Sequence, residues 1–179
     1  KISEETFVGV HSDQQWWQHY YSNGVTISGI FDVEFKLPPV PSGTYEIRLG
    51  YTVNVERGVV QAYLNNKPCG IPVDLRMFGT DPRIGWIEDT EDEEENIAND
   101  KAMHNRGYMK GMDCYRQYDS DHTLRANTNN LRRILVTQYL DSNETYKLRF
   151  RQVLDDPECY LSFDFIELCP KSVYGSPEG

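Results

Sequence analysis

The chain has 179 residues, a formal net charge of −10 and an aromatic content of 12%. This length fits one domain with a sizeable core. The acidic balance argues against nucleic-acid binding, because a duplex-binding surface needs clustered Lys and Arg. No run approaches the ~20 apolar residues of a membrane span, so we expect no membrane insertion by this domain.

Strand signals begin after the turn dipeptide Asn23-Gly24. Residues 25–35 mix β-branched and aromatic side chains and stop at a proline-rich segment. In residues 44–55, apolar and polar side chains alternate strictly, which predicts a strand with one buried and one solvent-exposed face. We expect residues 59–64 to return beside it as its antiparallel partner, and residues 71–75 to form a short edge strand.

Alternation is lost between residues 77 and 130. This segment carries seven acids within residues 88–95, and a short helix is expected over residues 96–103. Connections of this length are usually functional or disordered. We predict a mobile acidic run that buries nothing, followed by an ordered second half.

Strand patterns resume over residues 131–140, 145–153 and 160–168. Many short strands with almost no helix predict an all-β jelly-roll sandwich. We expect one domain over residues 1–170 with a long irregular insertion at 77–130, and the start of a linker or tail at 171–179. The predicted core comprises Tyr45, Ile47, Leu49, Tyr51, Leu148, Phe150 and Phe163.

Several segments are similar to known domains. Residues 43–68 and the closing strands 146–150 and 163–168 resemble galactose-binding-like jelly rolls. The segments His104-Asn105-Arg106-Gly107-Tyr108-Met109-Lys110-Gly111 and Cys169-Pro170-Lys171-Ser172-Val173-Tyr174 resemble a domain of Bacteroidetes fasciclin-domain surface lipoproteins, encoded near glycan-uptake systems. The resemblance implies an exported, glycan-associated role on the outer-membrane surface, through a lipid anchor outside this chain. It supplies no ligand residues.

Four cysteines, Cys69, Cys114, Cys159 and Cys169, lack the spacing of a zinc site. Cys159 and Cys169 flank one predicted strand, which separates them if it is straight. A Cys69–Cys114 disulfide and free buried thiols both remain open.

Sugar rings present C–H patches that exposed aromatic faces bind well. Aromatic rings outside the regular strands are therefore candidate ligand contacts, together with nearby hydrogen-bonding side chains. The candidates are Trp86, Tyr115, Tyr118, Arg106 and Trp17, with Trp86 favoured because Gly85 leaves the chain free to expose the ring. The alternative is that these rings cap the sandwich.

No cofactor is expected. A structural calcium ion is a separate hypothesis, with Asp164 as one ligand and Glu4 or Glu5 as loose candidates for another. The acidic run is more typical of a solvated loop, since it lacks the order of an EF-hand loop.

Nucleophile motifs are absent, and no carboxylate pair stands out among the 28 acids. We therefore expect no enzyme, but a non-catalytic carbohydrate-binding or adhesion module for a neutral or weakly charged polysaccharide. The alternative is a structural spacer or a protein-interaction domain that contacts partner surface proteins. The chain begins at Lys1 without Met, which indicates a piece of a longer precursor.

Overall fold

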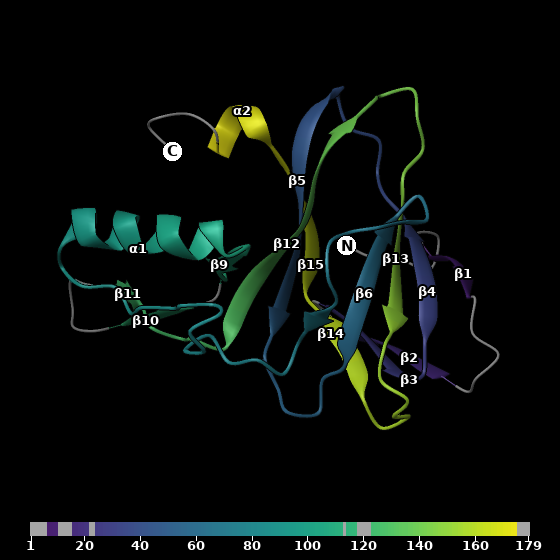
Figure 1. Cartoon of the computed structure of the whole chain (residues 1–179), viewed down its shortest axis with the longest axis horizontal. Helices are drawn as coiled ribbons and strands as arrows, with labels where there is room; N and C mark the ends of the chain where they lie inside the picture. Colours follow the sequence, from purple (N-terminus) through teal and green to yellow (C-terminus); the bar gives the residue numbers. More distant parts are fainter. Residues whose placement is uncertain (1–6, 11–15, 22–23, 113, 118–122, 175–179) are drawn as a thin grey trace.

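The computed structural model describes residues 7–10, 16–21, 24–112, 114–117 and 123–174. It is an all-β sandwich with one lateral lobe, shown in Figure 1. The strands are β1 (Phe7–Val10), β2 (Trp16–Tyr21), β3 (Gly24–Gly29), β4 (Asp32–Lys36), β5 (Gly43–Thr52), β6 (Val59–Leu64), β7 (Lys67–Pro68), β8 (Val73–Asp74), β9 (Tyr108–Lys110), β10 (Tyr115–Gln117), β11 (Thr123–Arg125), β12 (Asn130–Leu140), β13 (Lys147–Gln152), β14 (Tyr160–Phe163) and β15 (Phe165–Pro170). The helices are α1 (Glu93–Asn105) and α2 (Lys171–Tyr174).

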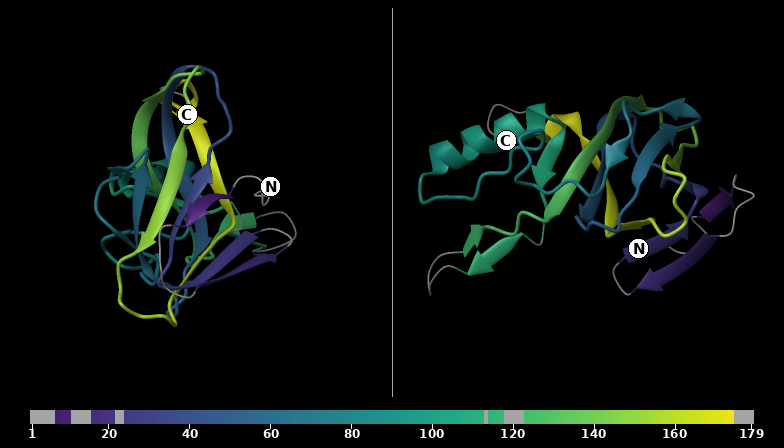
Figure 2. Two further views of the ribbon diagram at one scale, coloured as in Figure 1. Left: turned by 90° about the vertical axis from the view of Figure 1, so that its right-hand side faces the viewer. Right: turned by 60° about the horizontal axis from the view of Figure 1, so that its bottom comes forward.

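Early strands pair with late ones, as expected for a jelly roll. One sheet has the order β1-β4-β13-β6-β7, with β8 also paired to β6. The sheet that faces it has the order β15-β5-β12-β9, and β14-β3-β2 forms a third, smaller sheet. The views of Figure 2 show the two larger sheets as separate layers.

The predicted core is confirmed. Tyr45, Ile47, Leu49, Tyr51, Leu148, Phe150 and Phe163 are all buried, with at most 7% of any of them exposed. The Phe35, Phe150 and Phe163 rings lie with their centroids 5.8–6.2 Å apart, in edge-on and tilted arrangements. Such aromatic pairs add about 0.5–1.5 kcal/mol each beyond the area that they bury.

Two predictions about β5 are wrong. It does not pair with β6, because β5 lies between β12 and β15 while β6 pairs with β13 in the opposite sheet. Its polar face is also not solvent-exposed, since Glu46 and Arg48 are 3% and 2% exposed. Alternation in the sequence identifies the two faces of a strand correctly, but it does not show what covers the polar one.

Two predicted strands are interrupted. Residues 25–35 divide into β3 and β4 at Gly29, whose φ of 101° favours glycine. The final strand divides at Asp164 into β14, which pairs with β3, and β15, which pairs with β5. Because of this break, consecutive strands of one segment pair with strands of two different sheets.

The insertion forms the lobe beside β12. Helix α1 is longer than expected and begins inside the acidic run, because the Asp92 carboxylate accepts hydrogen bonds from the backbone N–H groups of Glu94 and Glu95. Acids in the first turn also interact favourably with the helix dipole. Strand β9 adds to the edge of β12, and β10 pairs with β11.

We predict that Leu148→Ala lowers the free energy of unfolding by about 2–5 kcal/mol, because it leaves a cavity at a side chain that is 0% exposed. Urea unfolding of the variant and the parent measures the difference. The control is Ile71→Ala, at a position that is 74% exposed, where we expect a change within about 0.5 kcal/mol. A loss at Leu148 no larger than that of the control would contradict the inward register of β13.

Candidate functional site: a polar pocket at one end of the sandwich

The prediction that Trp86 is an exposed sugar platform is wrong. Trp86 is 5% exposed and belongs to the same core cluster as Ile84 and Met103. Gly85 does adopt a left-handed conformation, with φ of 74°, but the turn that it makes is closed by its N–H bonding to the Asp81 carbonyl. Gly85 therefore permits a tight turn, and this turn directs the Trp86 ring into the core of the lobe.

The other predicted ligand residues are not brought together. Arg106 is exposed at the end of α1, where its Nη1 donates to the Ala102 carbonyl at 2.9 Å. Trp17 lies in β2 and Tyr115 in β10, but their side chains are outside the described part of the structure, as is Tyr118 altogether. For these four residues, ligand binding stays a prediction.

The lobe is organised by a buried ion cluster below the Trp86 ring. The Lys110 ammonium is 3% exposed and lies 2.5 Å from Asp89 and 3.4 Å from Asp100. Arg125 joins the same two carboxylates, at 2.6 and 2.7 Å. The Lys110 ammonium also lies 5.6 Å from the centre of the Trp86 ring, which adds a cation–π attraction.

The expectation that the acidic run buries nothing is therefore also wrong. The Asp89 side chain is 10% exposed. Its burial raises the pKa of the carboxyl group, but the hydrogen bonds from Arg125 and Lys110 outweigh this effect and leave the pKa below its ordinary value. Lys110 of β9 and Arg125 of β11 thus fix the position of Asp89, which belongs to the acidic run.

We expect Trp86→Ala to destabilise the domain by about 3–5 kcal/mol, the usual loss for a buried Trp. Trp86→Phe is the control. It keeps most of the buried ring, and it gives up an indole N–H that has no hydrogen-bond partner in this structure. Thermal unfolding of both variants measures the effect, and a fully stable Trp86→Ala protein would contradict the buried placement of the ring.

The lowered pKa of Asp89 predicts an acid dependence of stability. Its stabilising contribution is complete above the pKa of an unfolded Asp, ~3.9, and is lost as the pH falls through the lower pKa of the folded state. We expect Asp89→Asn to be less stable than the parent at pH 7 and to lose less stability on acidification below pH ~4. Urea midpoints across this pH range measure it, with the exposed Glu158→Gln as control. Parallel profiles for Asp89→Asn and the parent would refute this role.

A second ion network joins α1 to the sandwich. On the polar face of β5, Arg48 Nε donates to Glu46 Oε2 at 2.8 Å, and His104 of α1 lies 2.9 Å from the other Glu46 oxygen. Glu167 of β15 bridges Arg48 and Arg132, each at 3.2 Å. The lobe is thus joined to the central strand through the contact between His104 and Glu46.

The calcium hypothesis is not tested. Asp164 is exposed, and its N–H donates to the Gly50 carbonyl at 2.8 Å. Within the residues that the structure describes, no group of three or more His, Cys, Asp or Glu side chains could hold a metal ion. Glu4 and Glu5 lie outside those residues. The four cysteines are all free, and three of them are buried.

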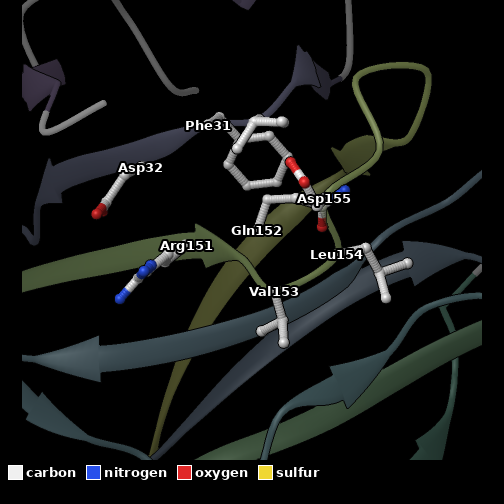
Figure 3. A pocket seen from close by; sticks show the side chains of 8 residues that line it. Phe31, Asp32, Arg151, Gln152, Val153, Leu154 and Asp155 are labelled. Atoms are coloured by element: carbon white, nitrogen blue, oxygen red, sulfur yellow. The ribbon is translucent and has the colours of Figure 1, made fainter. Parts of the chain in front are cut away.

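A pocket of about 290 Å³ opens between the β3–β4 turn and the loop that follows β13. Figure 3 shows the side chains that line it. They are Ile30, Phe31, Asp32, Arg151, Gln152, Val153, Leu154 and Asp155. The volume is near the lower end of that of small-molecule sites, and the lining combines apolar groups with an amide, two carboxylates and a guanidinium.

Gln152 is the unusual member of this lining. It is 4% exposed, yet among the residues that the structure describes neither Oε1 nor Nε2 of its amide has a hydrogen-bond partner. Buried polar groups are nearly always hydrogen-bonded, and leaving one unsatisfied costs about 1–3 kcal/mol. The Cys159 thiol lies beside this amide: burial first and Asp156 second raise the pKa of the thiol, and the contact with Gln152 opposes that rise. The amide packs against Gly58, where an added Cβ would collide with Oε1, so a ligand in the pocket would reach the amide only after the side chain turns toward it.

The alternation of side chains along β13 indicates Gln152 as a site residue, although aromatic content does not. Leu148 and Phe150 occupy the inward positions of β13, and Gln152 is the next inward position. A polar side chain that is in phase with a buried face needs a partner inside the fold. The alternation along β13 therefore identifies Gln152, one of the residues that line the pocket, independently of exposed aromatic residues.

The structure contains no helix in its described part that is long and apolar enough to cross a membrane. No family model and no curated protein matches the sequence. Among solved structures, a Paenibacillus xanthan lyase is similar, with a TM-score of 0.48 and 11% sequence identity. The match covers 93% of this chain but 13% of the lyase chain, so this chain spans a small part of that protein.

Proposed function

We propose that this chain is a non-catalytic carbohydrate-binding domain and that the pocket beside Gln152 is its ligand site. The observation that carries the proposal is the buried amide of Gln152, for which the described part of the chain provides neither a donor nor an acceptor. A sugar hydroxyl both donates and accepts hydrogen bonds, so neighbouring hydroxyls on one ring can satisfy both ends of an amide. Hydrogen bonds from a ligand to this amide would offset the cost of burying it.

The remaining lining suits the same ligand class. Asp155 offers acceptor oxygens at the mouth of the pocket, and the exposed Arg151 offers donors. Val153 and Leu154 contribute aliphatic surface against which the C–H face of a ring can pack. A few polar groups placed among apolar ones are typical of small-molecule sites.

The state of Asp32 supports binding rather than catalysis. Arg149 Nε and Nη2 donate to the two Asp32 oxygens at 2.6 and 2.5 Å, so both oxygens are engaged. A glycosidase needs two carboxyl groups available on opposite sides of the scissile bond. Of the two acids that line this pocket, Asp155 is the one not held in this way.

The biological setting belongs to the same proposal. We place the domain on the outer surface of a Bacteroidetes cell, as part of a fasciclin-domain lipoprotein that takes part in glycan uptake and is anchored by lipid outside this chain. The support is the likeness of residues 104–111 and 169–174 to that group of proteins. In this setting the ligand is an extracellular polysaccharide.

One observation favours the alternative role in protein–protein interaction. Of the thirteen residues of α1, Met103 is the one that is buried, and Ile97 is 46% exposed. A helix that contributes so little to the core presents most of its surface to solvent, where a neighbouring surface protein could contact it. This role would place the binding surface on the lobe and not at the pocket.

The test is Gln152→Met, which keeps the length of the side chain and removes both hydrogen-bonding groups. We expect the variant to be more stable than the parent by about 1 kcal/mol, because an unsatisfied buried amide is replaced by an apolar group. It should also lose its response to the polysaccharide that a glycan screen identifies for the parent, measured by calorimetry.

The matched control is Gln138→Met at an exposed position of β12, which should change neither quantity. Equal glycan affinity in Gln152→Met and the parent would move the ligand site away from the pocket. Binding of no glycan by the parent, together with capture of a partner through α1, would favour the alternative.

A further inference from the structure

The outward face of the β4–β13 strand pair is basic, although the whole chain is acidic. Val33, Phe35, Leu148, Phe150 and Gln152 occupy the inward positions, so alternation places the other side chains of both strands on the outer face. These side chains are Asp32, Glu34, Lys36, Lys147, Arg149 and Arg151. The face thus carries four cations and two acids, on a chain whose net charge is −10.

The two acids are already neutralised. Asp32 binds Arg149 at 2.5 Å, and Glu34 binds Lys147 at 3.2 Å. Among the ion pairs of the described residues, none involves Lys36 or Arg151, and both side chains are exposed. The excess positive charge of this face therefore resides on these two residues.

The strand register makes the arrangement unfavourable for the protein alone. Lys36 lies directly opposite Lys147 in the β4–β13 ladder. Like charges in directly opposed positions destabilise a sheet. The ion pair of Lys147 with Glu34 offsets part of this repulsion, and an anionic group bound between the two ammonium groups would offset the remainder.

The basic face is continuous with the pocket. Arg151 and Asp32 are opposite each other in the register and both line the pocket. From Arg151 to Lys147 the strand advances four residues, or ~13 Å, which is longer than a single sugar ring. Beside this path on β6, the Tyr63 ring packs under Arg149, with 5.1 Å between the guanidinium carbon and the ring centre.

We propose that the basic strip Lys36, Lys147 and Arg151 binds the acid groups of a polysaccharide whose adjoining sugar occupies the pocket. This inference rests on the proposed function and narrows its ligand to an acidic glycan that carries carboxylate or sulfate groups. Nucleic acids and anionic membranes are poorer occupants, because each needs a broader cationic surface than a strip that is two strands wide.

The experiment compares binding of oligogalacturonates of increasing length, dextran sulfate and neutral dextran by calorimetry at two salt concentrations. The parent should bind the acidic oligomers more tightly as they lengthen and less tightly as salt rises. A preference for oligogalacturonate assigns the ligand groups as carboxylates, and a preference for dextran sulfate assigns them as sulfates.

The variant is Lys36→Gln combined with Arg151→Gln, which breaks no ion pair of the described residues. It should lose about tenfold or more in affinity for the acidic ligand, equivalent to ~1.4 kcal/mol. It should also melt slightly higher than the parent, because the repulsion of Lys147 is removed. The control is Lys101→Gln combined with Lys171→Gln, which removes the same net charge at two exposed positions and should keep the parent's affinity.

Acidic-glycan affinity that is equal in the strip variant and the control would overturn this inference. Binding of neutral dextran without binding of any acidic glycan would also overturn this inference. In that case, loss of dextran binding in Gln152→Met would show that the proposed function stands without the strip. Binding of duplex DNA or anionic vesicles as tightly as the acidic glycan would overturn the assignment to a polysaccharide. If no glycan binds at all, the proposed function fails as well.

Discussion

The charges buried on the outer face of β5 constrain the whole arrangement. Glu46 and Arg48 lie on a strand with hydrogen-bonded neighbours on both sides, and removing such charges from water is costly unless each is paired. His104 on α1 contacts Glu46, and Glu167 on β15 contacts both Arg48 and Arg132 on β12. The sandwich and the lobe therefore share one polar network, and displacing the lobe would leave the buried Glu46 carboxylate with fewer partners.

Much of the sandwich could be predicted from the sequence, because alternation is a local property. The inward positions of β5 and β13 follow directly from a period of two, and all of those residues are buried. Strand pairing is not local. Nothing in residues 43–64 shows that β5 and β6 separate into opposite sheets, since that depends on strands that come about 70 residues later in the chain.

The site was harder to predict, because composition does not show exposure. A tryptophan after a glycine fits a surface ring and a buried ring equally well, and Trp86 is buried because its lobe needs a core. The burial of Asp89 within the acidic run was not predictable for a related reason. Its charge indicates solvation, but Asp89 meets Lys110 and Arg125, which lie 21 and 36 residues further along the chain. Gln152 was predictable in principle, from the phase of its strand.

The position of β13 has a consequence for synthesis of the chain. Both neighbours of this strand, β4 and β6, precede it by more than eighty residues, so neither can complete its hydrogen bonding until residue 152 has left the ribosome. During that interval two strands with apolar inner faces expose open edges, which are templates for wrong pairing. The charged residues on the outer face of β4 thus have a second use, because charged side chains discourage such edges from joining other chains. Nascent chains that end before β13 are the forms in which this protection matters most.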